Sequence, residues 1–195
     1  MARPSWDDEM RQAALDTLDS LHWVKGPQGK AFGSEFASYS DAVQGTPCQS
    51  GSVALWAALR LLEIGPGDEV LVPSLTYIAT ATCVSLAGAT PVFVDVEPDY
   101  WCVDLAALEA ARTPNTKAVI AVHLFGQMCD DDLVKWCDDH GIAYIEDAAQ
   151  AHGAVAKNGT KAGGVGDVAC FSFFPSKNLA VGGEGGMVTP RREDL

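Results

Sequence analysis

The sequence predicts an α/β fold, a three-layer sandwich in which a mostly parallel sheet lies between helices. From residue 48 onward, short runs rich in valine, isoleucine and aromatic residues alternate with amphipathic stretches. Parallel strands require connections long enough to hold a helix, and these stretches meet that requirement. With 195 residues, of which 48% are hydrophobic, the chain can build one substantial core.

Two helices are expected before this alternation begins. Residues 6–22 have helical spacing, with Met10, Ala14, Leu18 and Leu21 on one side and acidic residues in the first turn. The Gly-Pro-Gln-Gly sequence at 26–29 ends this pattern, and an aromatic-rich helix follows it. The domains expected from this pattern are an N-terminal helical segment over 1–25 and one larger domain over 26–195.

Capping and turn residues set the boundaries of the alternating elements. Ser50, Gly51 and Ser52 open the first helix of the series, and Gly88 and Gly141 end two later ones. The runs between these helices have the composition of strands. The expected helices span 50–64, 77–88, 104–112 and 130–141, and the expected strands span 69–73, 90–96, 117–126, 142–147, 167–174 and 185–189.

Composition excludes several classes of partner. The net charge is −13, and no basic cluster is longer than Arg191-Arg192, which argues against nucleic acid and against an anionic membrane. The start of the chain is polar and acidic, unlike a signal peptide, and no apolar run approaches the roughly 20 residues of a membrane span. Six cysteines without a CxxC pair indicate reduced core thiols, so we expect a cytoplasmic protein.

An acidic residue and a lysine follow two of the predicted strands. Asp147 ends an apolar strand. Lys177 follows an aromatic strand and has Ser172, Ser176 and Asn178 as its polar neighbours in the sequence. Ligands of such sheets bind at the carboxyl ends of the strands. Pyridoxal phosphate (PLP) requires a lysine that holds its aldehyde as a Schiff base and a carboxylate that keeps its ring nitrogen protonated. Taken singly, the aspartate could instead cap a helix and the lysine could lie on the surface.

Other residues could complete such a site. The helix that begins at Gly51 and Ser52 offers free N–H groups to an anion, although a simple helix cap is the common explanation of such a start. Tyr77 follows a strand and could stack on a planar ring or pack at the sheet edge. Gln150 lies one helical turn beyond Asp147. His152 could act in acid–base chemistry or be structural. No metal-binding motif is present.

A series of segments resembles the DegT/DnrJ/StrS family of PLP-dependent aminotransferases that act on nucleotide-linked keto sugars. The segments, in the order of the family, are SGSVAL, GPGDEVLVPSLTYIATA, GATPVFVDVEPD, TPNTKAVIAVHLFGQ, IEDAAQAHGA, GDVACFSFFPSKNL and GEGGMV. The resemblance runs from about residue 26 to the end of the chain. It implies that 26–195 is the PLP-binding large domain of a fold-type I transferase.

The resemblance also implies roles for single residues. Lys177 falls on the Schiff-base lysine and Asp147 on the partner of the ring nitrogen. Related sugar dehydratases carry histidine at the lysine position, so Lys177 favours transamination. The remaining matches are Gln150 near the ring hydroxyl, Tyr77 on the stacking aromatic, and Ser52, Val53 (through its N–H) and Ser172 on the phosphate contacts.

The implied reaction is a ping-pong transfer of an amino group, with L-glutamate as donor and a nucleotide-linked keto sugar as acceptor. A cyclitol or an aminobenzoate precursor is an alternative acceptor within the family. The resemblance implies a homodimer with a shared active site. It also implies a role in making cell-envelope polysaccharides or antibiotic sugars.

Length is the main departure from the family. Members of the family are longer, and their second half supplies a small domain, substrate contacts and a residue that reaches the phosphate of the neighbouring subunit. We therefore expect a fragment or a truncated gene product, and an inactive or merely PLP-binding chain is the main alternative. An NAD-binding Rossmann protein is disfavoured, because no GxGxxG follows the first strand.

Overall fold

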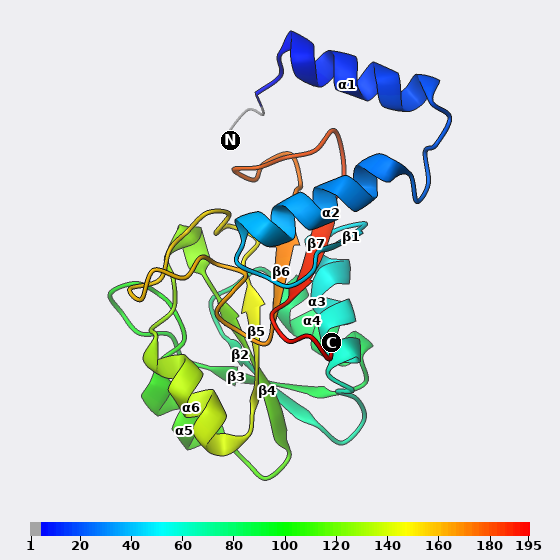
Figure 1. The fold of residues 1–195 in the computed structure, drawn as a ribbon. Coiled ribbons are helices and arrows are strands. Elements are labelled where there is room, and N and C mark those ends of the chain that lie inside the picture. The colour runs from blue at the N-terminus through cyan, green and yellow to red at the C-terminus, as the bar shows by residue number, and fades with distance from the viewer. Residues whose placement is uncertain (1–4) are drawn as a thin grey trace.

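The computed structural model describes residues 5–195 and has one seven-stranded sheet with helices on both faces (Figure 1). The strand order is β1-β7-β6-β5-β4-β2-β3. The strands are β1 (Thr46–Cys48), β2 (Glu69–Pro73), β3 (Thr90–Val94), β4 (Thr116–Val122), β5 (Ala143–Asp147), β6 (Val168–Ser172) and β7 (Gly186–Pro190). The helices are α1 (Asp8–Asp19), α2 (Pro27–Tyr39), α3 (Gly51–Leu61), α4 (Ala79–Leu86), α5 (Leu105–Ala111) and α6 (Asp132–His140), with the 3-10 helix η1 (Leu124–Gly126).

The sheet is parallel in its centre and antiparallel at one edge. Each neighbouring pair from β3 through β2, β4 and β5 to β6 is parallel. β7 is antiparallel to β6, and β1 is antiparallel to β7. The predicted α/β fold with a mostly parallel sheet is confirmed. The sequence does not predict β1, because three residues that include a proline carry no strand signal.

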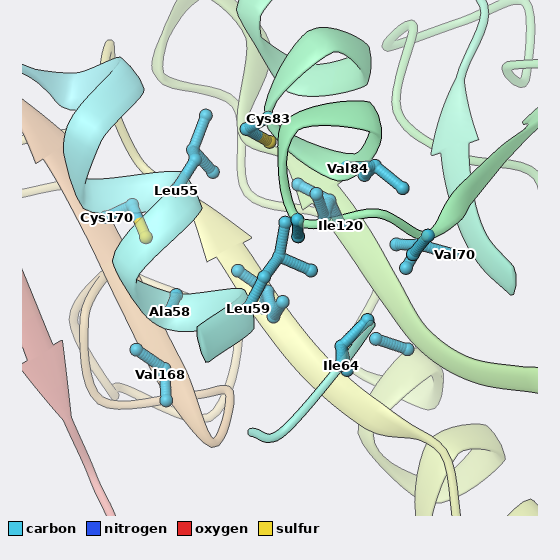
Figure 2. Close-up of a cluster of buried hydrophobic side chains, with 14 of the residues drawn as sticks. Leu55, Ala58, Leu59, Ile64, Val70, Cys83, Val84, Ile120, Val168 and Cys170 are labelled. Atoms are coloured by element: carbon cyan, nitrogen blue, oxygen red, sulfur yellow. The ribbon is translucent and has the colours of Figure 1, made fainter. Parts of the chain in front are cut away.

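Two helical layers cover the sheet. Figure 2 shows the cluster in which α3 and α4 pack on one face, with Leu59 and Val84 wholly buried against Ile120 of β4. The other face is covered by α5 and α6, whose Leu108 and Leu133 are buried with further strand residues. Side chains alternate between the two faces along each strand, so both faces of the parallel strands must be apolar.

A third cluster attaches α2 to the end of the sheet. The ring of Phe36 packs edge-on against Phe171 and Phe173, with centroids 4.8 and 5.2 Å apart. All three rings are buried. In contrast, no residue of α1 is buried, and Figure 1 shows this helix apart from the sheet, beyond α2. The apolar side predicted for α1 therefore remains exposed to solvent in this structure.

The cysteines lie mostly in the core. All six cysteines are free, and all except Cys48 are buried, as predicted for reduced core thiols. Across the described residues, the structure contains no helix that combines the length and the apolar character needed to cross a membrane.

Two glycines allow α3 to begin directly against the ends of β6 and β7. A Cβ on Gly186 would collide with the carbonyl group of Ser50 and lie 2.8 Å from the nitrogen of Gly51. A Cβ on Gly51 would lie 2.8 Å from Cβ of Ser172. Because both positions lack side chains, the amino end of α3 and the carboxyl end of β6 come together.

We expect Gly186→Ala to lower the free energy of unfolding by about 1–3 kcal/mol, because the new methyl group overpacks a contact between two backbones. Urea unfolding followed by circular dichroism would measure the loss. Gly182→Ala and Gly183→Ala are matched controls, since an added Cβ there meets no heavy atom within 4 Å. Equal stability of all three variants would contradict the close approach of α3 and β7.

Candidate functional site

A cleft of about 660 Å³ opens at the carboxyl ends of the parallel strands. Its wall includes the ends of β4, β5 and β6, the amino end of α3, and the segment before α4. The strand register explains this position, because Asp147 pairs with Val122 on one side and with Cys170 on the other. Functional groups that follow three different strands therefore meet at one edge of the sheet.

Asp147 lies at the buried end of the cleft, with 6% of its surface exposed. One carboxylate oxygen accepts a hydrogen bond from the Thr80 hydroxyl at 3.0 Å, and the other accepts one from the Ala149 N–H at 3.2 Å. Burial raises the pKa of this carboxyl, although both hydrogen bonds and the charge of Lys177 oppose the rise. A buried carboxylate in this setting is well suited to a cationic partner.

Lys177 lines the same cleft and is half-buried. It lies in the turn after β6, where its backbone N–H donates to the carbonyl of Phe174 at 2.8 Å. The cleft therefore brings together the aspartate and the lysine that the sequence singles out. The lysine provides a nucleophilic amine, and the aspartate provides a negative charge at the far end of the cavity.

The amino end of α3 forms another part of the wall. The first N–H groups of a helix have no partner within the helix. At α3 the Ser50 hydroxyl accepts the N–H of Val53 at 3.3 Å, which leaves those of Gly51 and Ser52 for a ligand. The Ser172 side chain lines the same part of the cleft. Together with the helix dipole, these groups make a suitable site for an anion such as phosphate.

Gln150 and Tyr77 also line the cleft. The side-chain oxygen of Gln150 accepts the N–H of Phe125 at 2.7 Å, so its NH2 group is left to donate to a ligand. Residues 149–150 form a turn and not the start of a helix. Tyr77 is 72% exposed, so packing at the sheet edge does not hold its ring. Its aromatic face is accessible to a planar ligand.

The cleft thus contains nearly all the residues that the sequence singles out. Val53 is not part of its wall, and its N–H is taken by Ser50. His152 is also outside this wall and lines a neighbouring hollow. The residues in the wall are Gly51, Ser52, Tyr77, Asp147, Gln150, Ser172 and Lys177. Thr80, which supports Asp147, was missed by the sequence reasoning, because a threonine inside an apolar helix carries no signal of its own.

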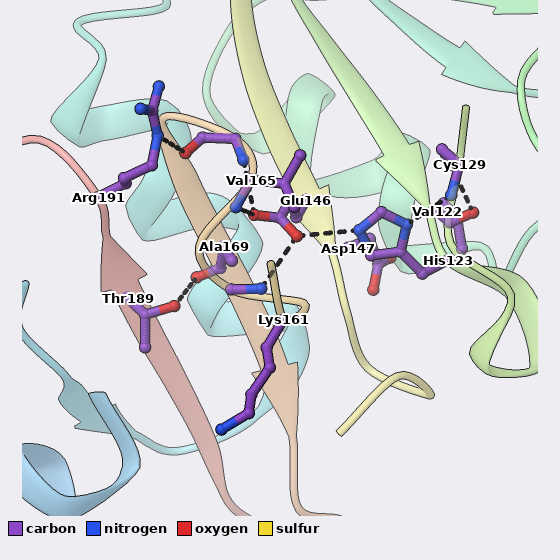
Figure 3. Close-up of polar contacts among 12 residues, drawn as sticks. Val122, His123, Cys129, Glu146, Asp147, Lys161, Val165, Ala169, Thr189 and Arg191 are labelled. Carbon is purple, nitrogen blue, oxygen red and sulfur yellow. Dashed lines mark hydrogen bonds and ion pairs between the residues drawn. The ribbon is translucent and has the colours of Figure 1, made fainter. Parts of the chain in front are cut away.

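A buried charged cluster lies beside Asp147 and was also missed (Figure 3). The Glu146 carboxylate accepts the N–H groups of Gly163, Val165 and Gly166 at 3.0, 2.9 and 2.7 Å. It is also 2.9 Å from Nε2 of His123. Since Nδ1 of His123 accepts the N–H of Cys129, Nε2 carries the proton and donates to Glu146. This cluster fixes the loops on both sides of β5.

The structure resembles those of aminotransferases over nearly its whole length. It superposes on S. venezuelae DesV in complex with a ketimine intermediate with a TM-score of 0.91 and 45% identity, covering 95% of this chain and 50% of that one. A protein of Streptococcus pneumoniae, solved in a PLP form, gives a TM-score of 0.92 at 33% identity, covering 100% of this chain and 53% of that one. The fold is therefore that of the PLP-dependent aminotransferases.

The sequence comparisons name the family. The family model of the DegT/DnrJ/EryC1/StrS aminotransferases matches residues 4–195, and the chain belongs to this family. A UDP-N-acetyl-3-dehydro-alpha-D-glucosamine 3-aminotransferase of Acidithiobacillus ferrooxidans is 49% identical over 189 residues, which are 96% of this chain and 51% of that protein. The chain spans about half the length of the curated relatives it matches.

We expect Glu146→Gln to lower the free energy of unfolding by about 2–6 kcal/mol at neutral pH. The amide nitrogen of glutamine cannot accept a hydrogen bond, so at least two of the buried donors around this carboxylate lose their acceptor, at about 1–3 kcal/mol each. Burial raises the pKa of Glu146, but the bond from His123 and the backbone N–H groups outweigh it and hold the pKa below 4.5. The stabilisation is therefore complete above pH 4.5 and is lost as the pH falls through the folded-state pKa.

Urea unfolding of both proteins over a range of pH would measure this difference. The difference in the free energy of unfolding between the wild type and Glu146→Gln should become smaller as the pH is lowered. Glu109→Gln is the control, because Glu109 is a surface carboxylate whose side chain is 50% exposed. Its removal should cost no more than about 1 kcal/mol. A Glu146→Gln protein as stable as the wild type would contradict the role of the cluster.

Proposed function

We propose that this chain is the cofactor-binding part of a PLP-dependent aminotransferase that moves an amino group from an L-amino acid, such as L-glutamate, to a nucleotide-linked keto sugar. The observation that carries the proposal is the shared cleft, in which Lys177 and the buried Asp147 meet the amino end of α3. Membership of the family supports the reaction, and the UDP-sugar named for the Acidithiobacillus ferrooxidans relative supports the class of acceptor.

The residues that line the cleft have the functional groups that PLP requires. The buried carboxylate of Asp147 suits the ring nitrogen, and the amine of Lys177 suits the aldehyde. The N–H groups of Gly51 and Ser52 with the hydroxyl of Ser172 suit the phosphate. The space also suffices, since a cleft of about 660 Å³ is in the range of cofactor pockets.

Bound PLP supplies an electron sink for the carbon that loses or gains the amino group. The chain supplies proton transfer and charge. Lys177 would hold the cofactor through its Nζ and, once free, would move a proton to and from the reacting carbon. Asp147 would keep the ring nitrogen protonated. Gln150 would donate its NH2 group to the ring hydroxyl, and Tyr77 would cover one face of the ring.

We further propose that the site is completed in a homodimer. Apolar side chains near the cleft are exposed in the single chain, among them Leu75, Tyr77 and Ile78 at 47, 72 and 65%. A second subunit and the additional residues of longer relatives would cover this rim. The second candidate function of these residues is PLP binding without turnover.

The first test is to add PLP to the purified chain, reduce with borohydride and map the modified peptide. We expect a pyridoxyl adduct on Lys177, because this lysine is the one in the cleft. Lys177→Ala should give no adduct, whereas the surface variant Lys135→Ala should react as the wild type does. An adduct spread over surface lysines would refute the assignment. Bleaching of the visible absorption by L-glutamate would separate a transaminase from a protein that only binds PLP.

A second test concerns the charge of Asp147. Asp147→Asn should keep the shape of the site but slow the bleaching by L-glutamate about 100-fold or more, because a neutral amide does not keep the ring nitrogen protonated. Stopped-flow absorbance would give the rate. Asp138→Asn, on the exposed side of α6, is the matched control and should leave the rate unchanged. An unaltered rate in Asp147→Asn would remove the aspartate from the mechanism.

A further inference from the structure

We propose that His152 and Asn178 form a positioning pair that holds Lys177 in the cleft. The inference rests on the proposed function of Lys177 as the cofactor lysine. His152 lies in the turn after β5, and Asn178 directly follows Lys177 in the turn after β6. A contact between these two residues therefore joins the turn that carries the lysine to the neighbouring strand end.

Two hydrogen bonds make this contact reciprocal. Nδ1 of His152 is 2.6 Å from Oδ1 of Asn178, and Nδ2 of Asn178 donates to the backbone carbonyl of His152 at 3.2 Å. A carbonyl oxygen only accepts, so the NH2 group of Asn178 must face it, and Oδ1 must face the ring. Oδ1 also only accepts. The proton of the neutral ring is therefore on Nδ1.

The ring of His152 is itself held firmly. It packs against Phe36, Phe171 and Phe173, with centroids 6.3, 5.4 and 5.4 Å away. Nε2 is buried and has no hydrogen-bond partner within the described residues. Among the described residues, the ring of His152 therefore makes its hydrogen bond through Nδ1. Burial lowers the pKa of His152, and the charge of Lys177 acts in the same direction, so the ring stays neutral beside the lysine.

Lys177 needs such an anchor because its turn is mostly exposed. Besides the bond from Lys177 to Phe174, the N–H of Val181 donates to the carbonyl of Phe173 at 2.9 Å. Lys177 also lines a second hollow next to the cleft, and His152 and Asn178 are in the wall of that hollow. The side chain of Lys177 therefore borders two cavities, the cleft and the second hollow. The hydrogen bonds between His152 and Asn178 fix the backbone next to Lys177, so that its amine points into the cleft.

The test compares His152→Phe with His152→Asn. Phenylalanine keeps the ring among its aromatic neighbours and removes the donor, whereas asparagine places an N–H close to the position of Nδ1. Hydrogen exchange of residues 174–181 in the cofactor-free chain is the first readout. We expect about tenfold faster exchange in His152→Phe, from the loss of one hydrogen bond, and wild-type exchange in His152→Asn.

The second readout is the rate of adduct formation at Lys177 at saturating PLP. It should fall about tenfold in His152→Phe and recover in His152→Asn. Asn178→Ala removes both hydrogen bonds of the pair and should slow adduct formation at least as much as His152→Phe. Adding His152→Phe to Asn178→Ala should cause no further loss, because the bond that His152→Phe removes is already absent. His22→Phe, at an exposed histidine, is the matched control.

The proposal would be overturned if His152→Phe and Asn178→Ala both showed the wild-type rate of hydrogen exchange and the wild-type rate of adduct formation at Lys177. If His152→Phe fails to fold, Asn178→Ala decides, because Asn178 is exposed and its loss leaves the core intact. A wild-type chain that forms no adduct at Lys177 would overturn the proposed function. In that case, the exchange measurements still report whether the pair restrains the turn.

Discussion

The carboxylate of Glu146 is the constraint on which the arrangement of the site depends. It is wholly buried, and it gathers three backbone N–H groups and the ring of His123 at the end of β5. The loops that follow β4 and precede β6 are thereby tied to the strand that ends at Asp147. A buried charge of this kind is tolerable only with all its hydrogen bonds made, so it rigidifies the loops around it.

The parallel sheet could be predicted from the sequence because its strands are buried on both faces and are separated by helix-sized segments with clear caps. The departures have physical causes. β1 exists only because β7 pairs with it, and pairing across the length of the chain leaves no local pattern in Thr46–Cys48. The side of α1 that carries apolar residues at helical spacing has no partner here, and spacing alone does not say what covers a helix.

For the site, the sequence reveals the residues that stand at strand ends and at a helix start, since these positions are defined by local signals. It does not reveal contacts that depend on register. Glu146 meets His123 only because β5 lies beside β4, and Thr80 reaches Asp147 only because α4 crosses the same strand end. The side chains that hold the cleft in shape therefore become visible only in the folded chain.

The contact between Gly186 and the start of α3 has a consequence for the order of folding. The helix start is made before β2, whereas β7, against which it is seated, is made only after β6. Contacts between such distant parts of a chain form late and slowly. The anion-binding end of the cleft is therefore assembled only once β7 has been made, and a chain that stops before β7 presents no formed cradle for an anion.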